Sequence, residues 1–145
     1  KPLNIKASGT AHIINPLEDT AVVSIIYPNG FNADIINNML CPIKERKIFI
    51  AGEKAILLWD DMAINGNKLK LYNNKIVSYD SKSGNLEYPS NNSIKTLTVS
   101  SKQAIENEVD YFISCLKDGD KPKNDENAGL QVMQFLENIN IAMRA

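Results

Sequence analysis

The sequence predicts an α+β domain with an open, mostly antiparallel sheet of six to seven strands and two C-terminal helices packed on one face. Short apolar runs with a period of two occupy much of residues 19–99, and Asn-Gly and other glycine turns separate them, which is typical of antiparallel strands. After residue 103, apolar residues recur at spacings of three and four, which is typical of amphipathic helices. Because the strands precede the helices, the order favours an α+β arrangement over alternating βαβ units.

The first hairpin is predicted over residues 19–36. Its first strand, 19–27, has one wholly apolar face and one mixed face, so we expect the apolar side to be buried. The residues of that face are Ala21, Val23, Ile25 and Tyr27. Asn29-Gly30 predicts a type I′ turn, because both residues tolerate positive φ, and residues 31–36 form the return strand.

Four further strands and one weak strand complete the predicted sheet. Pro42 interrupts the chain before them, since proline cannot donate to an interior ladder. The four strands are expected at 47–50, 55–59, 68–72 and 94–99, with turns at 51–54 and at Asn65-Gly66-Asn67. Residues 73–93 are rich in Asn, Ser, Gly and Pro and contain the weak strand, 75–79. We interpret them as a long surface excursion.

Two amphipathic helices are expected to close the domain. Ser100 and Gln103 fit a capping box for the first helix, and Gly119 ends it. Asn124 or Asp125 caps the second helix. Each helix has one apolar stripe. The stripes are Ile105, Val109, Phe112, Ile113 and Leu116 in the first helix, and Val132, Met133, Leu136, Ile139 and Met143 in the second.

Two helices can cover only one face of a sheet of this size, so the other face needs a partner. That face still carries large apolar side chains. They are Val22, Ile26, Ile36, Ile56 and Leu58, or the residues next to these in the strands, which point to the opposite face of the sheet. We therefore expect a second copy of the chain to pack on the open face of the sheet.

Composition and charge exclude several kinds of partner. The 145 residues carry a formal net charge of −1, and the basic residues are scattered, so we expect no nucleic acid or anionic lipid partner. The longest apolar run, residues 55–59, is far shorter than the roughly 20 residues that a membrane helix needs. Cys41 and Cys115 lie too far apart for a redox pair, and two lone thiols suit a reduced, cytoplasmic location.

Scarce residues exclude several kinds of catalytic site. The single histidine, His12, cannot form a two-histidine or three-histidine metal site, and we expect no metal. The two nearest glycines, Gly119 and Gly129, stand ten residues apart, so the chain contains no glycine-rich phosphate loop. A nucleophilic triad built on His12 lacks the turn that would present its serine.

Several short motifs occur in an order that is more specific than any one of them. In the first half they are Glu18-Asp19-Thr20-Ala21, Tyr27-Pro28-Asn29-Gly30, Pro42-Ile43-Lys44-Glu45-Arg46-Lys47-Ile48, Gly52-Glu53-Lys54-Ala55 and Asp60-Asp61. In the second half they are Asn107-Glu108, Phe112-Ile113, Gly119-Asp120-Lys121-Pro122, Asp125 and Gly129-Leu130. Over essentially the whole chain, this series resembles the C-terminal domain of the glucose-fructose oxidoreductase / inositol dehydrogenase / rhizopine catabolism family, and within it the UDP-N-acetylglucosamine 3-dehydrogenase-like branch.

The resemblance implies that residues 1–145 are the C-terminal substrate-binding and oligomerisation domain of an NAD(P)-dependent oxidoreductase. An N-terminal Rossmann domain, outside this sequence, would hold NAD or NADP, and the open sheet would form the oligomer interface. Members of the family carry their catalytic lysine, aspartate and histidine in segments that precede the part matched here. We therefore assign no catalytic role to Lys1 or His12, and we expect this chain alone to be inactive and to bind no cofactor.

Three polar residues are candidates for contacting the substrate. Lys44 and Arg46 would point to the same side of an extended chain, and beside Asn38 they could contact a carboxylate or the diphosphate of an activated sugar. The alternative for this cationic pair is a solvated edge or an intersubunit ion pair. Two further sets of side chains have a structural alternative as well.

The first set is acidic: Asp19 and the Asp60-Asp61 pair could serve as metal or acid/base carboxylates, but adjacent carboxylates more often end a strand and begin a turn. The second set is aromatic: Tyr27 and Trp59 could stack on a sugar, or they could belong to the core or the interface.

The leading hypothesis is that the intact protein transfers hydride between a sugar or nucleotide-sugar hydroxyl carbon and nicotinamide. In that protein, this chain would supply substrate contacts and the oligomer interface. The alternative is a non-catalytic α+β scaffold that binds carbohydrate or only oligomerises.

Overall fold

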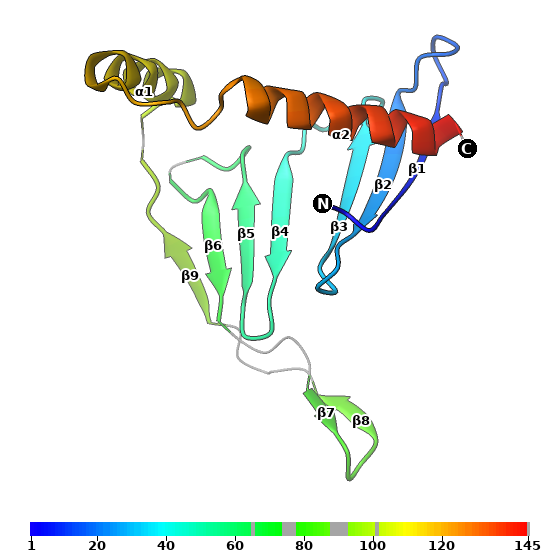
Figure 1. Ribbon diagram of the computed structural model, residues 1–145. Helices are drawn as coiled ribbons and strands as arrows, with labels where there is room; N and C mark the ends of the chain where they lie inside the picture. Colours follow the sequence, from blue (N-terminus) through cyan, green and yellow to red (C-terminus); the bar gives the residue numbers. More distant parts are fainter. Residues whose placement is uncertain (65, 74–77, 88–92, 101, 145) are drawn as a thin grey trace. The chain divides into compact units, whose positions relative to one another are not determined.

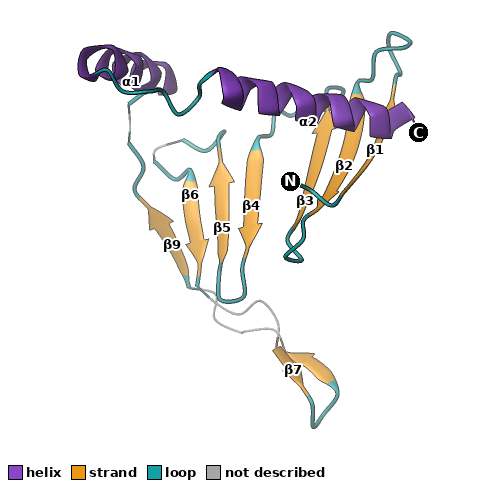
Figure 2. Ribbon diagram, in the orientation of Figure 1, coloured by secondary structure: helices purple, strands orange, loops and turns teal. Residues whose placement is uncertain are grey.

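The computed structural model describes residues 1–64, 66–73, 78–87, 93–100 and 102–144 (Figure 1). The chain divides into two compact units, one made of Lys1–Pro42 with Glu108–Ala145 and the other of Ile43–Asn107. Figure 2 shows the strands and helices of both units, and each unit is described by itself. The α+β class with antiparallel strands and two C-terminal helices is confirmed.

The first unit is a three-stranded antiparallel sheet with a helix on one face. Its strands are β1 (Asn4–Thr10), β2 (Thr20–Ile26) and β3 (Asn32–Asn38), in the order β1-β2-β3. Helix α2 (Glu126–Arg144) packs against β1 and lies across the sheet (Figure 1). Strand β1 was not among the predicted strands, because its inward residues include an alanine and a glycine and give little apolar alternation.

The core of this unit lies between the sheet and α2. Val23 and Ile25 of β2 are buried with Ile139 of α2. Partly buried side chains surround them, namely Ile5, Ala7, Tyr27, Ala33, Phe135 and Met143. The predicted inward face of the first strand is thus confirmed, since Val23 and Ile25 belong to it and Tyr27 packs against them.

Gly9 lies where β1 and α2 approach closely. A Cβ added to Gly9 would lie 2.8 Å from Cγ of Glu18 and 3.1 Å from Sδ of Met143, which is closer than packed side chains tolerate. The first of these neighbours lies in the connection between β1 and β2, and the second lies on α2. A glycine is therefore required here by close packing.

The turn between β2 and β3 differs from the prediction. The Gly30 N–H donates to the Tyr27 carbonyl at 3.2 Å, and the Tyr27 N–H donates to the Phe31 carbonyl at 2.9 Å. Gly30 alone carries the positive φ, 77°, after Pro28 and Asn29. This is a three-residue loop with a final left-handed glycine, not a two-residue type I′ turn. Pro28 favours it because its fixed φ suits the first central position of an ordinary turn.

The second unit contains a four-stranded antiparallel sheet in the order β4-β5-β6-β9. Its strands are β4 (Lys47–Ala51), β5 (Ile56–Asp60), β6 (Leu69–Tyr72) and β9 (Ile94–Leu97). Each corresponds to one of the predicted strands, and the Gly52 N–H closes the β4–β5 turn on the Ala55 carbonyl at 3.0 Å. The predicted single sheet of six to seven strands is therefore wrong in one respect, because these strands and those of the first unit form separate sheets of four and three strands. Pro42 lies in the irregular segment between β3 and β4.

The excursion after β6 contains a hairpin whose first strand includes residues 78 and 79 of the predicted weak strand and whose second strand was not predicted. Strands β7 (Ser78–Asp80) and β8 (Asn85–Glu87) pair with each other. Asp80 shapes the turn, since its carboxylate accepts the N–H groups of Lys82 and Ser83 at 2.9 and 3.2 Å. Residues 75–77 of the predicted weak strand, and Asn65 of the third turn, lie outside the described residues.

Helix α1 (Ala104–Asp118) begins with a different cap from the predicted one. The Glu106 carboxylate accepts the Gln103 N–H at 3.2 Å, so Gln103 is the N-cap residue. Ser100 instead accepts the Lys102 N–H at 3.2 Å. The carboxylate sits in the first turn, where the exposed N–H groups and the helix dipole favour negative charge.

The end of α1 and the start of α2 agree with the prediction. Gly119 has a φ of 70°, and the Asp120 N–H donates to the Cys115 carbonyl at 3.1 Å, as in a Schellman motif. Asp125 caps α2 by accepting the Ala128 N–H at 2.9 Å. In the described residues, no helix is long and apolar enough to cross a bilayer.

The packed face of α2 is rotated from the predicted stripe. Phe135, Ile139 and Met143 face the core, whereas Val132, Met133 and Leu136 are exposed. Ile139 and Met143 of the predicted stripe thus lie on the packed face, whereas its other three residues do not, because α2 meets β1 along the face that Phe135, Ile139 and Met143 share. In α1, the buried residue is Cys115, while the predicted stripe is exposed.

Candidate functional site

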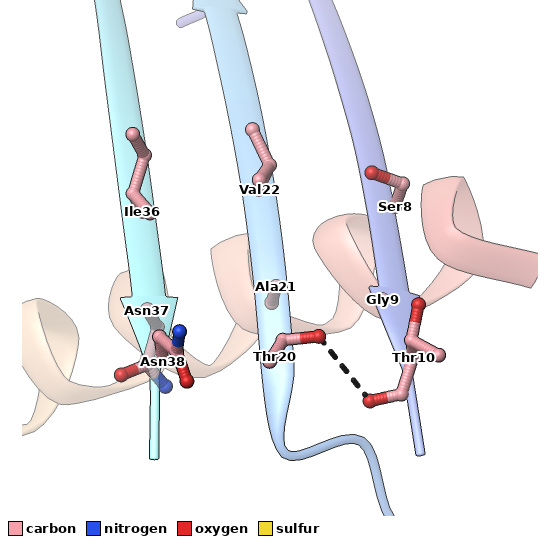
Figure 3. Close-up of a pocket in the computed structure, with 9 residues that line it drawn as sticks. All are labelled: Ser8, Gly9, Thr10, Thr20, Ala21, Val22, Ile36, Asn37 and Asn38. Atoms are coloured by element: carbon pink, nitrogen blue, oxygen red, sulfur yellow. Dashed lines mark hydrogen bonds between the residues drawn. The ribbon is translucent and has the colours of Figure 1, made fainter. Parts of the chain in front are cut away.

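The sheet of the first unit has an open face, opposite α2. Strand alternation places Val23 and Ile25 toward α2 and their neighbours toward the open face. This face contains a shallow hollow of about 220 Å³ (Figure 3). Six side chains of the open face line it, namely Ser8, Thr10, Thr20, Val22, Ile36 and Asn38. None of its lining residues carries a charge.

The strand register arranges these side chains in two rows. Ser8, Val22 and Ile36 lie opposite one another across the three strands, and Thr10, Thr20 and Asn38 form the next row. The first row offers mainly apolar surface, and the second offers two hydroxyls and an amide. The Asn38 side chain is held in place because its Oδ1 accepts the Leu40 N–H at 2.8 Å. The polar row stands where the strands end, beside the loop that joins β1 and β2.

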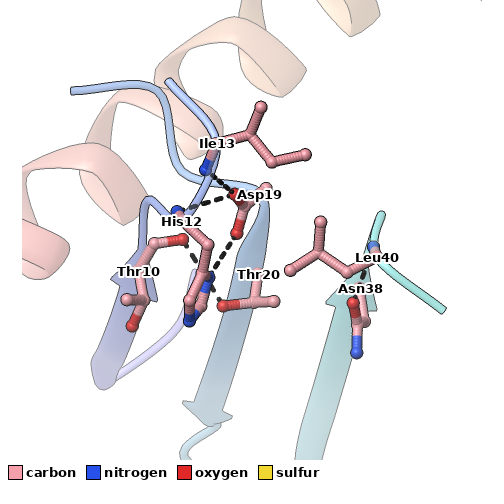
Figure 4. A network of polar contacts seen from close by, with 7 residues as sticks. All are labelled: Thr10, His12, Ile13, Asp19, Thr20, Asn38 and Leu40. Carbon is pink, nitrogen blue, oxygen red and sulfur yellow. Dashed lines mark hydrogen bonds and ion pairs between the residues drawn. The ribbon is translucent and has the colours of Figure 1, made fainter. Parts of the chain in front are cut away.

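That loop is organised by a buried carboxylate (Figure 4). Asp19 is only 8% exposed. Its Oδ2 accepts the backbone N–H groups of His12 and Ile13 at 2.7 and 2.9 Å, and its Oδ1 lies 2.7 Å from His12 Nδ1. The Asp19 backbone is also anchored, because its N–H donates to the Thr10 carbonyl at 3.0 Å.

The contacts indicate which atom carries the proton of the hydrogen bond between the two side chains. The hydrogen bond from the His12 side chain, joined by the two backbone N–H groups, lowers the pKa of Asp19 against the opposing effect of burial. Asp19 is therefore an ionised acceptor at neutral pH, and Nδ1 of His12 must carry the proton between them. The His12 side chain is 52% exposed. In the neutral ring, Nε2 is consequently an acceptor whose orientation Asp19 holds.

The sequence did not reveal this pair. His12 and Asp19 are seven residues apart and carry no catalytic or metal-binding spacing. The loop between them turns back on itself, since the Leu17 N–H donates to the Ile14 carbonyl at 2.7 Å. Within the described residues, no three His, Cys, Asp or Glu side chains gather as metal ligands. Of the two readings of Asp19, the structure shows a carboxylate that organises the start of a strand.

The predicted substrate residues are divided between the units. Asn38 belongs to the first unit and lines the hollow, whereas Lys44 and Arg46 belong to the second unit. Arg46 Nη1 lies 3.3 Å from Asp61 Oδ2, and Lys68 Nζ lies 3.1 Å from Asp61 Oδ1. These two cations lower the pKa of Asp61, Lys68 having the larger effect. Arg46 therefore forms an ion pair within the chain, and Lys44 is exposed.

The remaining candidates have structural roles. Asp60 ends β5, and its Oδ1 accepts the Met62 N–H at 3.0 Å, as the turn interpretation predicted. Trp59 lies partly buried in β5, with Lys68 Nζ 5.8 Å from the centre of its ring. Tyr27 packs against the core, and its ring centre lies 5.4 Å from that of Phe31.

Comparison with known proteins identifies the fold. No protein-family model matches the chain, and no curated protein matches it. Among the solved structures similar to it are two of UDP-N-acetylglucosamine 3-dehydrogenase GnnA from Acidithiobacillus ferrooxidans, in two crystal forms. Their TM-scores are 0.74 and 0.73, each at 17% sequence identity and over 98% of this chain. The chain spans 40% of the length of that protein, so part of a sugar-nucleotide dehydrogenase has this fold.

Proposed function

We propose that the chain is the substrate-binding and oligomerisation domain of an NAD(P)-dependent oxidoreductase that acts on a sugar or nucleotide sugar. The observation that carries the proposal is the fold likeness to UDP-N-acetylglucosamine 3-dehydrogenase over 98% of this chain. The ordered motifs, from Glu18-Asp19-Thr20-Ala21 to Gly129-Leu130, point to the same class of enzyme. Hydride would pass between a hydroxyl carbon of the sugar and the nicotinamide, in the cytoplasm.

The cofactor belongs outside this chain in the proposal. A dinucleotide needs a glycine-rich turn and a free helix N-terminus for its pyrophosphate. Here the first turn of α1 carries Glu106, whose carboxylate accepts the Gln103 N–H. The N-terminus of α2 is occupied by Asp125, with Glu126 beside it. These residues do not fit a pyrophosphate, so an N-terminal Rossmann domain would hold NAD or NADP and supply the acid/base residues.

The four-stranded sheet supports the oligomerisation part of the proposal. Its strand register places Ile48, Ile50, Leu57 and Trp59 on one face and Phe49, Ile56 and Leu58 on the other. Both faces of the β4–β5 pair thus carry apolar side chains, and the described residues of the unit contain no helix beyond the first turn of α1. The open face of the three-stranded sheet is more polar, because threonines, serines and asparagines separate Val22, Ile26 and Ile36. We therefore propose the four-stranded sheet as the principal contact between copies.

The substrate contacts proposed from the sequence are Asn38, Lys44 and Arg46. Arg46 is already paired with Asp61 at 3.3 Å, so binding a phosphate or carboxylate would require it to share or exchange that partner. Lys44 is exposed and is the more accessible cation. If these residues hold an anionic group of the substrate, Lys44→Ala should weaken substrate binding more than Arg46→Ala in the full-length protein.

The alternative function is a carbohydrate-binding or oligomerisation scaffold without catalysis. The hollow of the first unit favours it, because the lining of hydroxyl, amide and apolar groups suits a neutral sugar without any cofactor. The two functions differ in their need for a nucleotide-binding segment. The gene sequence upstream of the codon for Lys1 therefore discriminates between them.

The test combines that sequence with a binding measurement. The proposal predicts a G-x-G-x-x-G after a strand, an E-K-P and a D-x-x-x-H upstream of Lys1. NADH fluorescence should be enhanced by the protein that includes this segment and unchanged by the 145-residue chain. A start codon directly before Lys1, or micromolar NADH binding by the chain itself, would contradict the proposal.

A further inference from the structure

We infer that Asn29, in the turn between β2 and β3, is a site of spontaneous deamidation, at which the chain converts an asparagine into aspartate and isoaspartate with water as the only co-reactant. This chemistry belongs to one turn and is independent of the proposed oxidoreductase function. Three features of the turn favour it, namely the glycine that follows Asn29, the hydrogen bond that holds the Asn29 carboxamide, and the exposure of both residues.

The reaction has two steps. In the first, the Gly30 backbone nitrogen attacks Cγ of Asn29, and a new nitrogen–carbon bond forms. The bond from Cγ to Nδ2 breaks, and Nδ2 leaves as ammonia with the proton of the Gly30 nitrogen, so that a cyclic succinimide remains. In the second step, water adds to one of the two ring carbonyls and opens the ring to aspartate or isoaspartate. No group is oxidised or reduced.

Gly30 removes the main steric barrier to the first step. A side chain on the residue after an asparagine crowds the attack on Cγ, and glycine has none. No neighbouring group takes its place, since no atom of the described residues outside the turn lies within 4 Å of the position that a Gly30 Cβ would occupy. Asn29 and Gly30 are both exposed, so ammonia can leave and water can reach the ring.

A hydrogen bond holds the Asn29 carboxamide toward the residues that follow it. Asn29 Oδ1 accepts the Phe31 N–H at 3.3 Å, and such a contact with the N–H two residues on forms an Asx turn. The Gly30 nitrogen belongs to the ring of atoms that this bond closes, so the carboxamide is kept on the side from which that nitrogen attacks. The donor also draws electron density from Oδ1, which makes Cγ a better electrophile.

One contact opposes the reaction. The Gly30 N–H donates to the Tyr27 carbonyl at 3.2 Å, at the long end of the range for such bonds, and this bond must be released before the nitrogen attacks. The net contribution of such a hydrogen bond corresponds to roughly a two- to tenfold change in rate. We therefore expect Asn29 to deamidate more slowly in the folded chain than in the unfolded chain, by no more than about tenfold.

The products change the turn in two ways. Each adds one negative charge to a chain whose formal net charge is −1. Isoaspartate also inserts a methylene group into the main chain, which lengthens the loop between Tyr27 and Phe31. Because loop length selects the turn type of a hairpin, we expect the 2.9 Å hydrogen bond from the Tyr27 N–H to the Phe31 carbonyl to weaken in the isoaspartyl form.

The experiment ages the 145-residue chain at mildly alkaline pH, folded in buffer and unfolded in urea, and follows each asparagine by peptide mapping with mass spectrometry. Fragmentation by electron transfer distinguishes aspartate from isoaspartate. We expect both products at Asn29 in the folded chain. Asn32, which is exposed in the same hairpin but precedes Ala33, should stay unchanged over the same time.

The sequence contains a second Asn-Gly pair, Asn65-Gly66. Asn65 lies outside the described residues, and its conversion is counted separately because it falls in a different proteolytic peptide from Asn29. The rate at Asn29 is therefore measured on its own.

Two matched variants test the role of Gly30. Gly30→Asn introduces a residue that tolerates the positive φ of 77° and adds a side chain, so the rate at Asn29 should fall at least several-fold. Gly84→Asn makes the same change in the β7–β8 turn, at a φ of 70° and also in open space, and should leave the rate at Asn29 unchanged. Retained circular dichroism spectra show that both variants are folded.

Either of two results overturns the inference. One is the absence of both products at Asn29 in the folded chain after about ten times the interval that converts half of Asn29 in urea. The other is an equal rate at Asn29 in the wild type and in Gly30→Asn. Neither result bears on NADH binding or on the upstream sequence, so failure here is distinguishable from failure of the proposed oxidoreductase function.

Discussion

Truncation of Ile139 to alanine tests whether α2 is held to the sheet by one small core. Ile139 is 9% exposed and packs with Val23 and Ile25, which are 6% and 2% exposed. Ile→Ala changes in cores cost about 2–5 kcal/mol, because transfer energy is lost and a cavity remains. Half-buried neighbours such as Phe135 can move into part of the space, so we expect the lower half of that range, about 2–3 kcal/mol. Ile141→Ala on the same helix is the matched control, since Ile141 is 59% exposed, and it should change stability by no more than about 0.5 kcal/mol.

The assay is urea denaturation followed by circular dichroism at the helix band, to which the 19 residues of α2 contribute strongly. Tryptophan fluorescence serves as a separate probe of the second unit, because Trp59 is the single tryptophan of the chain. Ile139→Ala should lower the midpoint of the helix transition at an unchanged slope. Equal midpoints for Ile139→Ala and Ile141→Ala would refute the assignment of the α2 face that packs on the sheet.

Three further outcomes follow from individual residues. Gly9→Ala should destabilise the protein by about 1–3 kcal/mol because of the close approach of β1 and α2. Gly129→Ala should instead stabilise it by up to about 1 kcal/mol, because this helix position has open space around it. Thermal melts that rank the two variants the other way would contradict this. The folded pKa of Asp19 is lowered, so its contribution to stability is present above the unfolded pKa of about 3.9 and is lost as the pH falls through the folded pKa. Asp19→Asn should therefore flatten the acid side of a stability–pH profile, and an unchanged profile would argue against the pair. Cys41 is exposed and Cys115 is buried, so a thiol reagent should modify one cysteine in the native protein and both in denaturant, as mass spectrometry would show.

Much of the strand arrangement was predictable because one-sided burial leaves a period-two pattern. The β2 face that carries Val23 and Ile25 was read correctly for this reason. Strand β1 was missed because small inward residues, including Gly9, produce no such pattern. The β2–β3 turn was misread because Asn29-Gly30 fits two turn types, and Pro28 favours the longer one.

Helix ends were also largely predictable, since capping depends on neighbouring residues. Gly119 and Asp125 act as expected. The packed face of α2 was not predictable in the same way, because apolar residues lie on more than one side of the helix. Which of them is buried depends on where β1 crosses it, and that contact brings together residues more than a hundred positions apart.

In the candidate site, too, some features were predictable from the sequence and others were not. Asn38 was selected from the sequence as a substrate contact; the structure places it in the lining of the hollow, and its contact with a substrate stays a prediction. The ion pair of Arg46 with Asp61, and the pairing of His12 with Asp19, carried no recognisable spacing. Each arises because a turn returns the chain to a strand end, and the partners meet through that geometry.

The sequence by itself determined the α+β class, the positions of most strands, the end of α1 and the start of α2, because these depend on local periodicity and on residues within one turn. Only the tertiary structure decided which helix face is buried, how the open face combines hydroxyl and apolar side chains, and that an ionised Asp19 orients His12. These features depend on register and on packing between distant segments, where a shift of one residue would send every side chain to the opposite face.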